Sequence, residues 1–131
     1  MRIHHIALYA ENLEDMKSFY ETYFGAISNA LYHNPKTGLK TYFFKLGDGC
    51  KLEIMARPDV TRIDKGSPAA GYAHLALSAG GKAEVNCVTD RLRRDGYTVV
   101  SGPRVTGDGY YESCVLDPEG NPIEIVGDNN A

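Results

Sequence analysis

The pattern of apolar and polar positions along the chain predicts two kinds of element. Apolar residues recur at helical spacing over residues 13–24 and 82–94, which predicts two helices. Asn12 is the predicted N-cap of the first helix, and Gly25 and Gly96 are the predicted terminating glycines. Short β-prone runs with alternating apolar residues predict strands at residues 2–10, 26–32, 39–46, 50–56, 71–78, 97–100, 110–116 and 122–126.

The two halves of the chain repeat this order and part of their sequence. His5-Ile6-Ala7-Leu8 matches His74-Leu75-Ala76-Leu77. Glu53 follows His5 by 48 residues, and Glu124 follows His74 by 50 residues. Each half is therefore predicted to form one β-α-β-β-β module that contributes one histidine and one glutamate.

This repeat predicts an α+β fold of two βαβββ modules that form a curved mixed sheet around a cleft, with the helices outside. We expect one domain over residues 1–131, with modules at about 1–57 and 71–127 and a linker at 58–70. A half of about 55 residues is marginally stable alone, so the modules are expected to share a core.

Strand alternation predicts where the repeated polar residues point. His5 shares a face with Ala7 and Tyr9, whereas Ile6 and Leu8 face the opposite way. The same alternation separates Glu53 from its apolar neighbours, and it applies equally to the second half. We therefore expect four side chains to line the inner face: His5, Glu53, His74 and Glu124. His4 falls on the other face and is expected to take no part in metal binding.

Two imidazoles and two carboxylates are a ligand set for a divalent cation such as Zn²⁺, Ni²⁺, Co²⁺, Fe²⁺ or Mn²⁺. They suit neither Cu(I), which prefers sulfur, nor a Ca²⁺ site made only of oxygen. The competing interpretation is that each of these residues is structural, as a single histidine or glutamate in a strand commonly is. The repetition of both residues in the same strand phase favours the metal site.

Composition narrows the remaining function classes. The net charge of −3 argues against binding to a phosphate backbone, which needs a basic face, so no nucleic-acid partner is expected. No apolar run approaches the length of a membrane span, and the polar N-terminus lacks a signal-peptide core, so we expect no membrane association. Three scattered cysteines fit reduced thiols and a cytoplasmic location.

Five segments carry a family resemblance over residues 3–126: H-I-A-L-Y, N-L-E-D-M-K-S-F-Y, L-E-I-M, A-H-L-A-L-S and L-D-P-E-G-N-P-I-E-I. Together they resemble the vicinal-oxygen-chelate superfamily, and most of all its glyoxalase I, or lactoylglutathione lyase, group. The resemblance places the ligands of a zinc, nickel or cobalt ion on His5, Glu53, His74 and Glu124. It also implies a homodimer, with the metal site either within one chain or across two.

The activity implied by this resemblance is that of a metal-dependent lyase or isomerase acting on a 2-oxoaldehyde–thiol adduct. Glu124 and Glu53 would be catalytic, moving a proton through a metal-bound enediolate. Glu53 argues against the thiol-transferase branch, which lacks this second-strand glutamate. The alternatives are another enzyme of the superfamily, such as an acyl-CoA epimerase, or a non-catalytic small-molecule binding or resistance protein.

The identity of the thiol stays open at this point. Tyr9 stands where glutathione-using members of the group commonly have an arginine. Arg57 and Arg104 are the alternative anion anchors, and a plain surface position is the competing interpretation for each.

Overall fold

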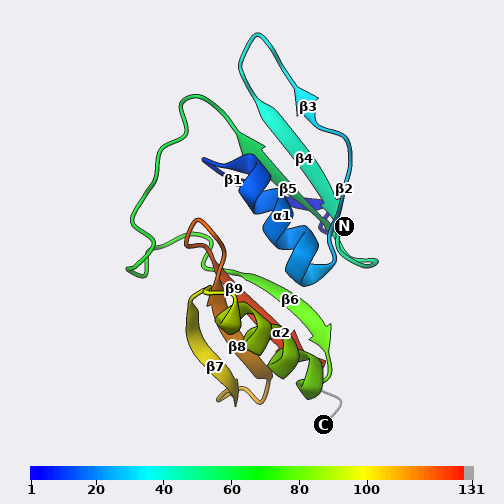
Figure 1. Cartoon of the computed structure of the whole chain (residues 1–131), viewed down its shortest axis with the longest axis vertical. Helices are drawn as coiled ribbons and strands as arrows, with labels where there is room; N and C mark the ends of the chain where they lie inside the picture. Colours follow the sequence, from blue (N-terminus) through cyan, green and yellow to red (C-terminus); the bar gives the residue numbers. More distant parts are fainter. Residues whose placement is uncertain (129–131) are drawn as a thin grey trace. The chain divides into compact units, whose positions relative to one another are not determined.

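The computed structural model describes residues 1–128 and divides into two compact units, Met1–Ile63 and Asp64–Ala131. Within the described residues each unit has one helix and one β-sheet (Figure 1). Neither helix in this part of the chain combines the length and the apolarity that a membrane span requires.

The first unit contains a mixed sheet and helix α1 (Leu13–Phe24). Strand β1 runs parallel to β5, and β4 pairs antiparallel with β5, β2 and β3. The sheet order is β1-β5-β4-β2, with β3 also on β4. The strands are β1 His5–Tyr9, β2 Ile27–Ser28, β3 Tyr32–His33, β4 Lys40–Lys45 and β5 Lys51–Ala56.

The second unit repeats this arrangement around helix α2 (Lys82–Arg94). Its sheet has the order β6-β9-β8-β7, with β6 parallel to β9 and the other pairs antiparallel. The strands are β6 Leu75–Gly80, β7 Val99–Val105, β8 Tyr111–Leu116 and β9 Pro122–Gly127. The predicted α+β fold of two βαβββ modules is confirmed.

The three helix-capping residues that the sequence predicts are found in these roles. The side chain of Asn12 accepts a hydrogen bond from the backbone N–H of Asp15 at 3.1 Å, which satisfies one of the free donors of the first turn. Gly25 ends α1 with φ +65°. Gly96 follows α2 with φ +90°, and Tyr97 N–H then reaches back to the carbonyl of Leu92 at 3.0 Å. These left-handed positions favour glycine.

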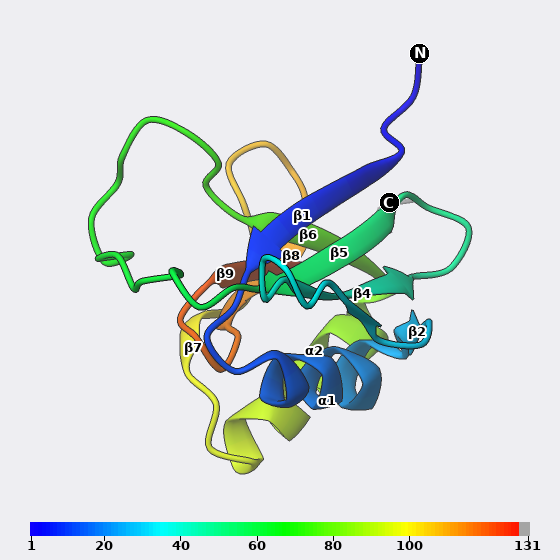
Figure 2. The same cartoon turned by 90° about the horizontal axis from the view of Figure 1, so that it is seen from above.

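Each unit has its core between the helix and one face of its sheet. Figure 2 shows α1 lying along one face of the first sheet. Tyr42 of β4 donates a hydrogen bond to Glu14 of α1, and Thr89 of α2 is hydrogen-bonded to Ser113 of β8. The buried apolar residues are Ala10, Leu13, Met16, Phe19, Tyr20, Ala26, Tyr42, Phe44, Leu52 and Ile54 in the first unit, and Val85, Leu92, Val115, Ile123 and Ile125 in the second.

Strand alternation therefore fixes the direction of the intervening side chains. In β5, Leu52 and Ile54 are buried on the helix side, so Glu53 points to the opposite face. In β9 the same argument applies to Glu124 between Ile123 and Ile125. We call this opposite side of each sheet its helix-free face, and it carries the candidate chemistry.

Four strand predictions were wrong in their bounds. The strand predicted at 2–10 is shorter and forms β1 at His5–Tyr9. The strand predicted at 26–32 is interrupted, and β2 and β3 form two short pieces that both pair with β4. The strand predicted at 71–78 begins later and ends later, as β6 at Leu75–Gly80. His74 consequently precedes the strand rather than lying within it.

The fourth difference concerns strand β7, predicted at 97–100 and observed at Val99–Val105. The strand continues through Gly102 and Pro103, which composition assigns to a loop. Strand β7 pairs only with β8 and lies at the edge of its sheet, with register shifts along the pair. An edge strand tolerates proline because the missing N–H faces away from the ladder.

Candidate metal centre

The first unit brings His5 and Glu53 together on the helix-free face of its sheet. His5 Nε2 lies 3.8 Å from Glu53 Oε1, with the histidine side chain 39% exposed and the glutamate 14% exposed. Thr41 of β4 donates a hydrogen bond to the other carboxylate oxygen of Glu53 at 3.0 Å. The ring of Phe43 packs edge-on against His5 with 5.4 Å between centroids. These contacts hold both side chains beside each other on the helix-free face of β1 and β5.

His4 contacts this pair, contrary to the expectation that it lies apart from it. Its Nδ1 atom is 2.8 Å from Nδ1 of His5, which makes a hydrogen bond in which either ring can be the donor. The sequence argument failed here because β1 begins at His5. His4 precedes the strand, so strand alternation does not fix its direction. The contact occupies one ring nitrogen of His5 and leaves Nε2 directed at Glu53.

The second unit brings His74 and Glu124 together in the same way. His74 Nε2 lies 3.0 Å from Glu124 Oε2, with the two side chains 38% and 28% exposed. His74 immediately precedes β6, which runs parallel to β9, and Ala76 pairs in register with Glu124. The histidine and glutamate predicted for each half are therefore neighbours within that half.

Glu112 is a residue of this face that the sequence analysis missed. It is 8% exposed and lies on β8, where Cys114 pairs in register with Glu124. Its carboxyl group lies within hydrogen-bonding reach of the carboxyl group of Glu124. The repeat contained the signal: Glu124 follows Glu53 by 71 positions, and the same offset relates Glu112 to Thr41. Each of the two candidate glutamates, Glu53 and Glu124, thus has a hydrogen-bonding neighbour 12 residues before it.

The surroundings of Glu124 favour its protonated form. Burial raises the pKa of the Glu124 carboxyl above its ordinary value, and the hydrogen bond and charge of Glu112 raise this pKa further. The charges of His74 and Arg104 act in the opposite direction. The carboxyl of Glu124 is therefore a stronger proton acceptor than an ordinary glutamate.

The alternative anion anchors have different surroundings. Arg57 donates two hydrogen bonds to Asp59, at 2.9 and 2.8 Å, and is occupied by that contact. Arg104 lies on β7 in register with Glu112, close enough to act on Glu124 electrostatically. Neither half, within residues 1–128, gathers three or more His, Cys, Asp or Glu side chains in a group able to hold a metal ion.

Comparison with known proteins identifies the same family over nearly the whole chain. Residues 2–125 match the model of the Glyoxalase/Bleomycin resistance protein/Dioxygenase superfamily. The uncharacterized protein YqjT of Bacillus subtilis (strain 168) is 28% identical over 130 residues, which cover 95% of this chain and 97% of YqjT.

Two solved structures illustrate the likeness of fold. A lactoylglutathione lyase from Agrobacterium tumefaciens is 27% identical with a TM-score of 0.69, and the match covers 96% of this chain and 92% of that protein. Glyoxalase I from Zea mays is 19% identical with a TM-score of 0.79, over 95% of this chain. The chain spans only 44% of the length of the maize protein. At that identity the likeness concerns the fold alone.

The contact between Glu112 and Glu124 predicts a measurable pKa change. In metal-free protein, Glu112→Gln should lower the pKa of Glu124, because an amide N–H donates to the ionised carboxylate and stabilises it. The pKa can be followed through the side-chain carboxyl carbon in a ¹³C NMR titration. Asp48→Asn is the matched control, since it removes the same charge from an exposed turn. Equal shifts in both variants would contradict a specific contact.

The raised pKa also predicts a pH dependence of folding stability. The folded protein holds the Glu124 proton more tightly than the unfolded chain does. Its contribution to stability is complete below the ordinary pKa of 4.5 and is lost as the pH rises through the raised folded-state pKa. Urea denaturation of metal-free protein over this pH window should therefore show a smaller decrease in the free energy of unfolding for Glu112→Gln than for the wild type.

Proposed function

The chain belongs to the Glyoxalase/Bleomycin resistance protein/Dioxygenase superfamily, and we propose that it is a divalent-metal-dependent lyase of the glyoxalase I kind. Its substrate would be the adduct of a 2-oxoaldehyde and a thiol. The observation that carries the proposal is the pairing of one imidazole with one carboxylate on the helix-free face of each half. The proposal combines both pairs, His5 with Glu53 and His74 with Glu124, on one cation.

The donor set fits such a cation. Two ligands bound side by side at about 2.0–2.2 Å from a metal ion are separated by roughly 3 Å. The nitrogen–oxygen distances within the two pairs are 3.8 and 3.0 Å. Two imidazole nitrogens and two carboxylates suit zinc, nickel or cobalt. His4 supports the role of His5, because a hydrogen bond at one ring nitrogen orients the other toward a metal.

When bound, the cation would stabilise the negative charge that develops on the neighbouring substrate oxygens as a proton leaves carbon. Side chains of the protein would carry out the proton transfer itself. Glu124 would take the proton from the carbon that carries sulfur, while the electron pair moves toward the adjacent carbonyl oxygen. Return of that proton to the neighbouring carbon, together with transfer of the hydroxyl proton to the former carbonyl oxygen, yields the thioester of a 2-hydroxy acid. Atoms and electrons therefore balance without an oxidant or reductant.

The two glutamates are suited to different parts of this reaction. Glu124 is the preferred base, because burial and Glu112 raise its affinity for a proton. Glu53 accepts the hydrogen bond of Thr41, which fixes its carboxylate beside His5. We therefore assign Glu53 as ligand and as the counterpart that assists proton transfer from the other half.

The first prediction concerns metal binding. Metal-free protein should take up one Ni²⁺ or Zn²⁺ per chain, and His5→Ala or His74→Ala should each weaken that binding by more than about 100-fold. His4→Ala should cost only about 10- to 100-fold, as expected for a residue that orients a ligand. Isothermal titration calorimetry measures both affinity and stoichiometry. His33→Ala, which removes an exposed histidine of β3, is the matched control.

Two independent sites would contradict this proposal. They would appear as two cations per chain, with His5→Ala abolishing one and leaving the other unchanged. Mixing His5→Ala with His74→Ala chains distinguishes the two arrangements of the proposed homodimer. Recovery of one of the two sites in each mixed dimer indicates a site built across two chains, and no recovery indicates a site within one chain.

The second prediction separates metal binding from turnover. Glu124→Gln should retain metal affinity within about tenfold but lower kcat by about 10²- to 10⁴-fold, because the amide cannot accept the substrate proton. The assay follows thioester formation from methylglyoxal and a panel of thiols, with Asp48→Asn as a charge-matched control. Undiminished turnover in Glu124→Gln would remove its assigned role. Activity on methylmalonyl-CoA in place of all the adducts would indicate an epimerase.

A further inference from the structure

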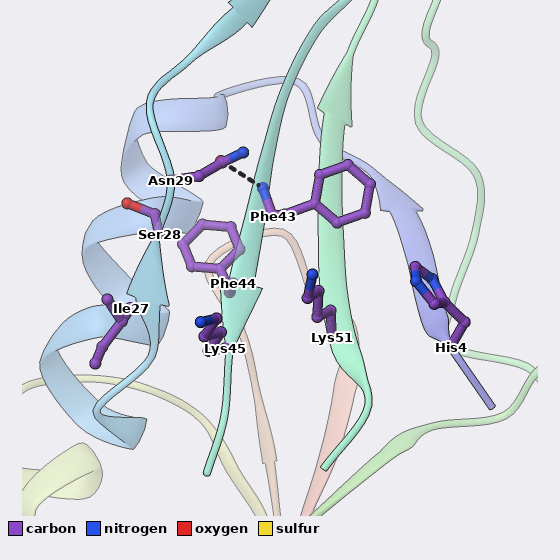
Figure 3. Close-up of a pocket in the computed structure, with 8 residues that line it drawn as sticks. All are labelled: His4, Ile27, Ser28, Asn29, Phe43, Phe44, Lys45 and Lys51. Atoms are coloured by element: carbon purple, nitrogen blue, oxygen red, sulfur yellow. Dashed lines mark hydrogen bonds between the residues drawn. The ribbon is translucent and has the colours of Figure 1, made fainter. Parts of the chain in front are cut away.

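A cavity in the first unit is lined by two positively charged side chains, Lys45 and Lys51, that have no role in the proposed reaction. It has a volume of about 430 Å³ and opens on the sheet at strands β2, β4 and β5 (Figure 3). Its lining residues are His4, Ile27, Ser28, Asn29, Phe43, Phe44, Lys45 and Lys51. None of these eight carries a negative charge, although the chain as a whole has a net charge of −3.

The two lysines face each other across neighbouring strands. In the antiparallel register of β4 and β5, Phe44 lies opposite Leu52. The next pair outward is Lys45 and Lys51, the last residue of β4 and the first of β5. Like charges in directly opposed positions are unfavourable. No ion pair found within residues 1–128 involves either lysine. An anion between the two ammonium groups would remove this repulsion.

The second half shows that the fold does not require these charges. The offset of 71 positions that relates Glu53 to Glu124 also relates Lys45 to Leu116 and Lys51 to Pro122. Leu116 and Pro122 are opposed in the same register position of β8 and β9. The same strand pairing is thus satisfied by two apolar residues, so the opposed lysines are a feature of the first half alone.

The rest of the lining adds apolar surface and a fixed amide. Phe43 and Ile27 contribute an aromatic and an aliphatic side chain. The side-chain oxygen of Asn29 accepts a hydrogen bond from the backbone N–H of Phe43 at 2.9 Å, which holds the amide at the cavity (Figure 3). A ligand with an anionic group and an apolar portion matches this combination.

The cavity adjoins the first imidazole–carboxylate pair. His4 and Phe43 both line it, and both contact His5, the former by the hydrogen bond and the latter by ring packing. Lys51 stands two residues before Glu53 on the same strand, and the N–H of Lys51 bonds to the carbonyl of His4 at 3.2 Å. Two residues of a strand span roughly 7 Å and return to the same face.

From this placement we propose that the cavity binds the anionic group, carboxylate or phosphate, of the thiol portion of the substrate. Lys45 and Lys51 supply the charge. Lys51 pairs in register with His5, and Glu53 lies two residues, roughly 7 Å, further along β5 on the same face. This inference rests on the proposed function and narrows it to adducts of acidic thiols. Charge-assisted contacts from two lysines set the affinity for substrate, whereas Glu124 and Glu53 carry out the proton transfer.

Anion binding can be tested without turnover. Inorganic phosphate and acetate are titrated separately into ¹⁵N-labelled metal-free protein at constant ionic strength, and amide shifts of residues 43–51 are followed by NMR. The double variant Lys45→Gln/Lys51→Gln should weaken binding of the preferred anion at least about tenfold. Lys36→Gln/Lys40→Gln removes the same charge from the other end of the hairpin and should change binding less than about twofold. A melting temperature at or above that of the wild type shows that the first variant folds.

Either anion supports the proposal if its binding depends on Lys45 and Lys51, and the stronger one identifies the group. Equal weakening in both double variants, or no saturable binding to the wild type, would overturn it. This result does not depend on lyase activity, so failure of the subsite and failure of the proposed reaction are distinguishable.

A kinetic comparison then connects the cavity to substrate. For the methylglyoxal adduct of 3-mercaptopropionate, Lys45→Gln/Lys51→Gln should raise KM about tenfold and leave kcat within about twofold. The adduct of the neutral 2-mercaptoethanol should be unaffected by the same change. An equal rise in KM for both adducts would show that the lysines do not read the acidic group, and would refute the assignment of substrate class.

Discussion

The alternation of side chains along a strand is the constraint on which the rest of this structure depends. Each helix covers one face of its sheet, and burial of Phe44, Leu52 and Ile54 on the helix side commits that face to the core. Glu53 is then directed to the opposite face whatever its own preference. In β9 the burial of Ile123 and Ile125 directs Glu124 in the same way. A shift of one residue in the register of either strand would turn the apolar side chains away from the helix and the glutamate toward it. Packing of the core therefore also fixes the register of the candidate site.

The repeat supplies two copies of this arrangement, and the differences between the copies are as informative as the likeness. Thr41 in the first half gives Glu53 a neutral hydrogen-bond donor. Its counterpart Glu112 gives Glu124 a second carboxyl group, which together with burial raises the pKa of Glu124. The same fold thus provides one glutamate suited to hold a cation and one suited to accept a proton. Duplicated modules can divide a reaction in this way because each change is confined to one sheet.

The two halves also differ in charge at one pair of opposed strand positions. The opposed lysines at the end of the β4–β5 hairpin have apolar counterparts in the second half, Leu116 and Pro122. Membership of the superfamily accounts for the fold. It does not explain why Lys45 and Lys51, which make no ion pair with any of residues 1–128, lie beside a cavity. An acidic substrate accounts for both the cavity and its charge, and it joins the proposed lyase chemistry to a defined class of thiol.

The sequence by itself determined the two-module fold and identified one histidine and one glutamate in each half as candidate ligands: His5, Glu53, His74 and Glu124. Both follow from local rules: the period of strands and helices, the caps at Asn12, Gly25 and Gly96, and the recurrence of one short pattern. Only the tertiary structure decided which strand neighbours reach these residues. The contact of His4 with His5, the hydrogen bond between Glu112 and Glu124, and the opposition of Lys45 and Lys51 all depend on strand register or on chain direction outside a strand. Hydrophobic periodicity assigns a side chain to a face, but hydrogen bonding between strands decides what it meets there.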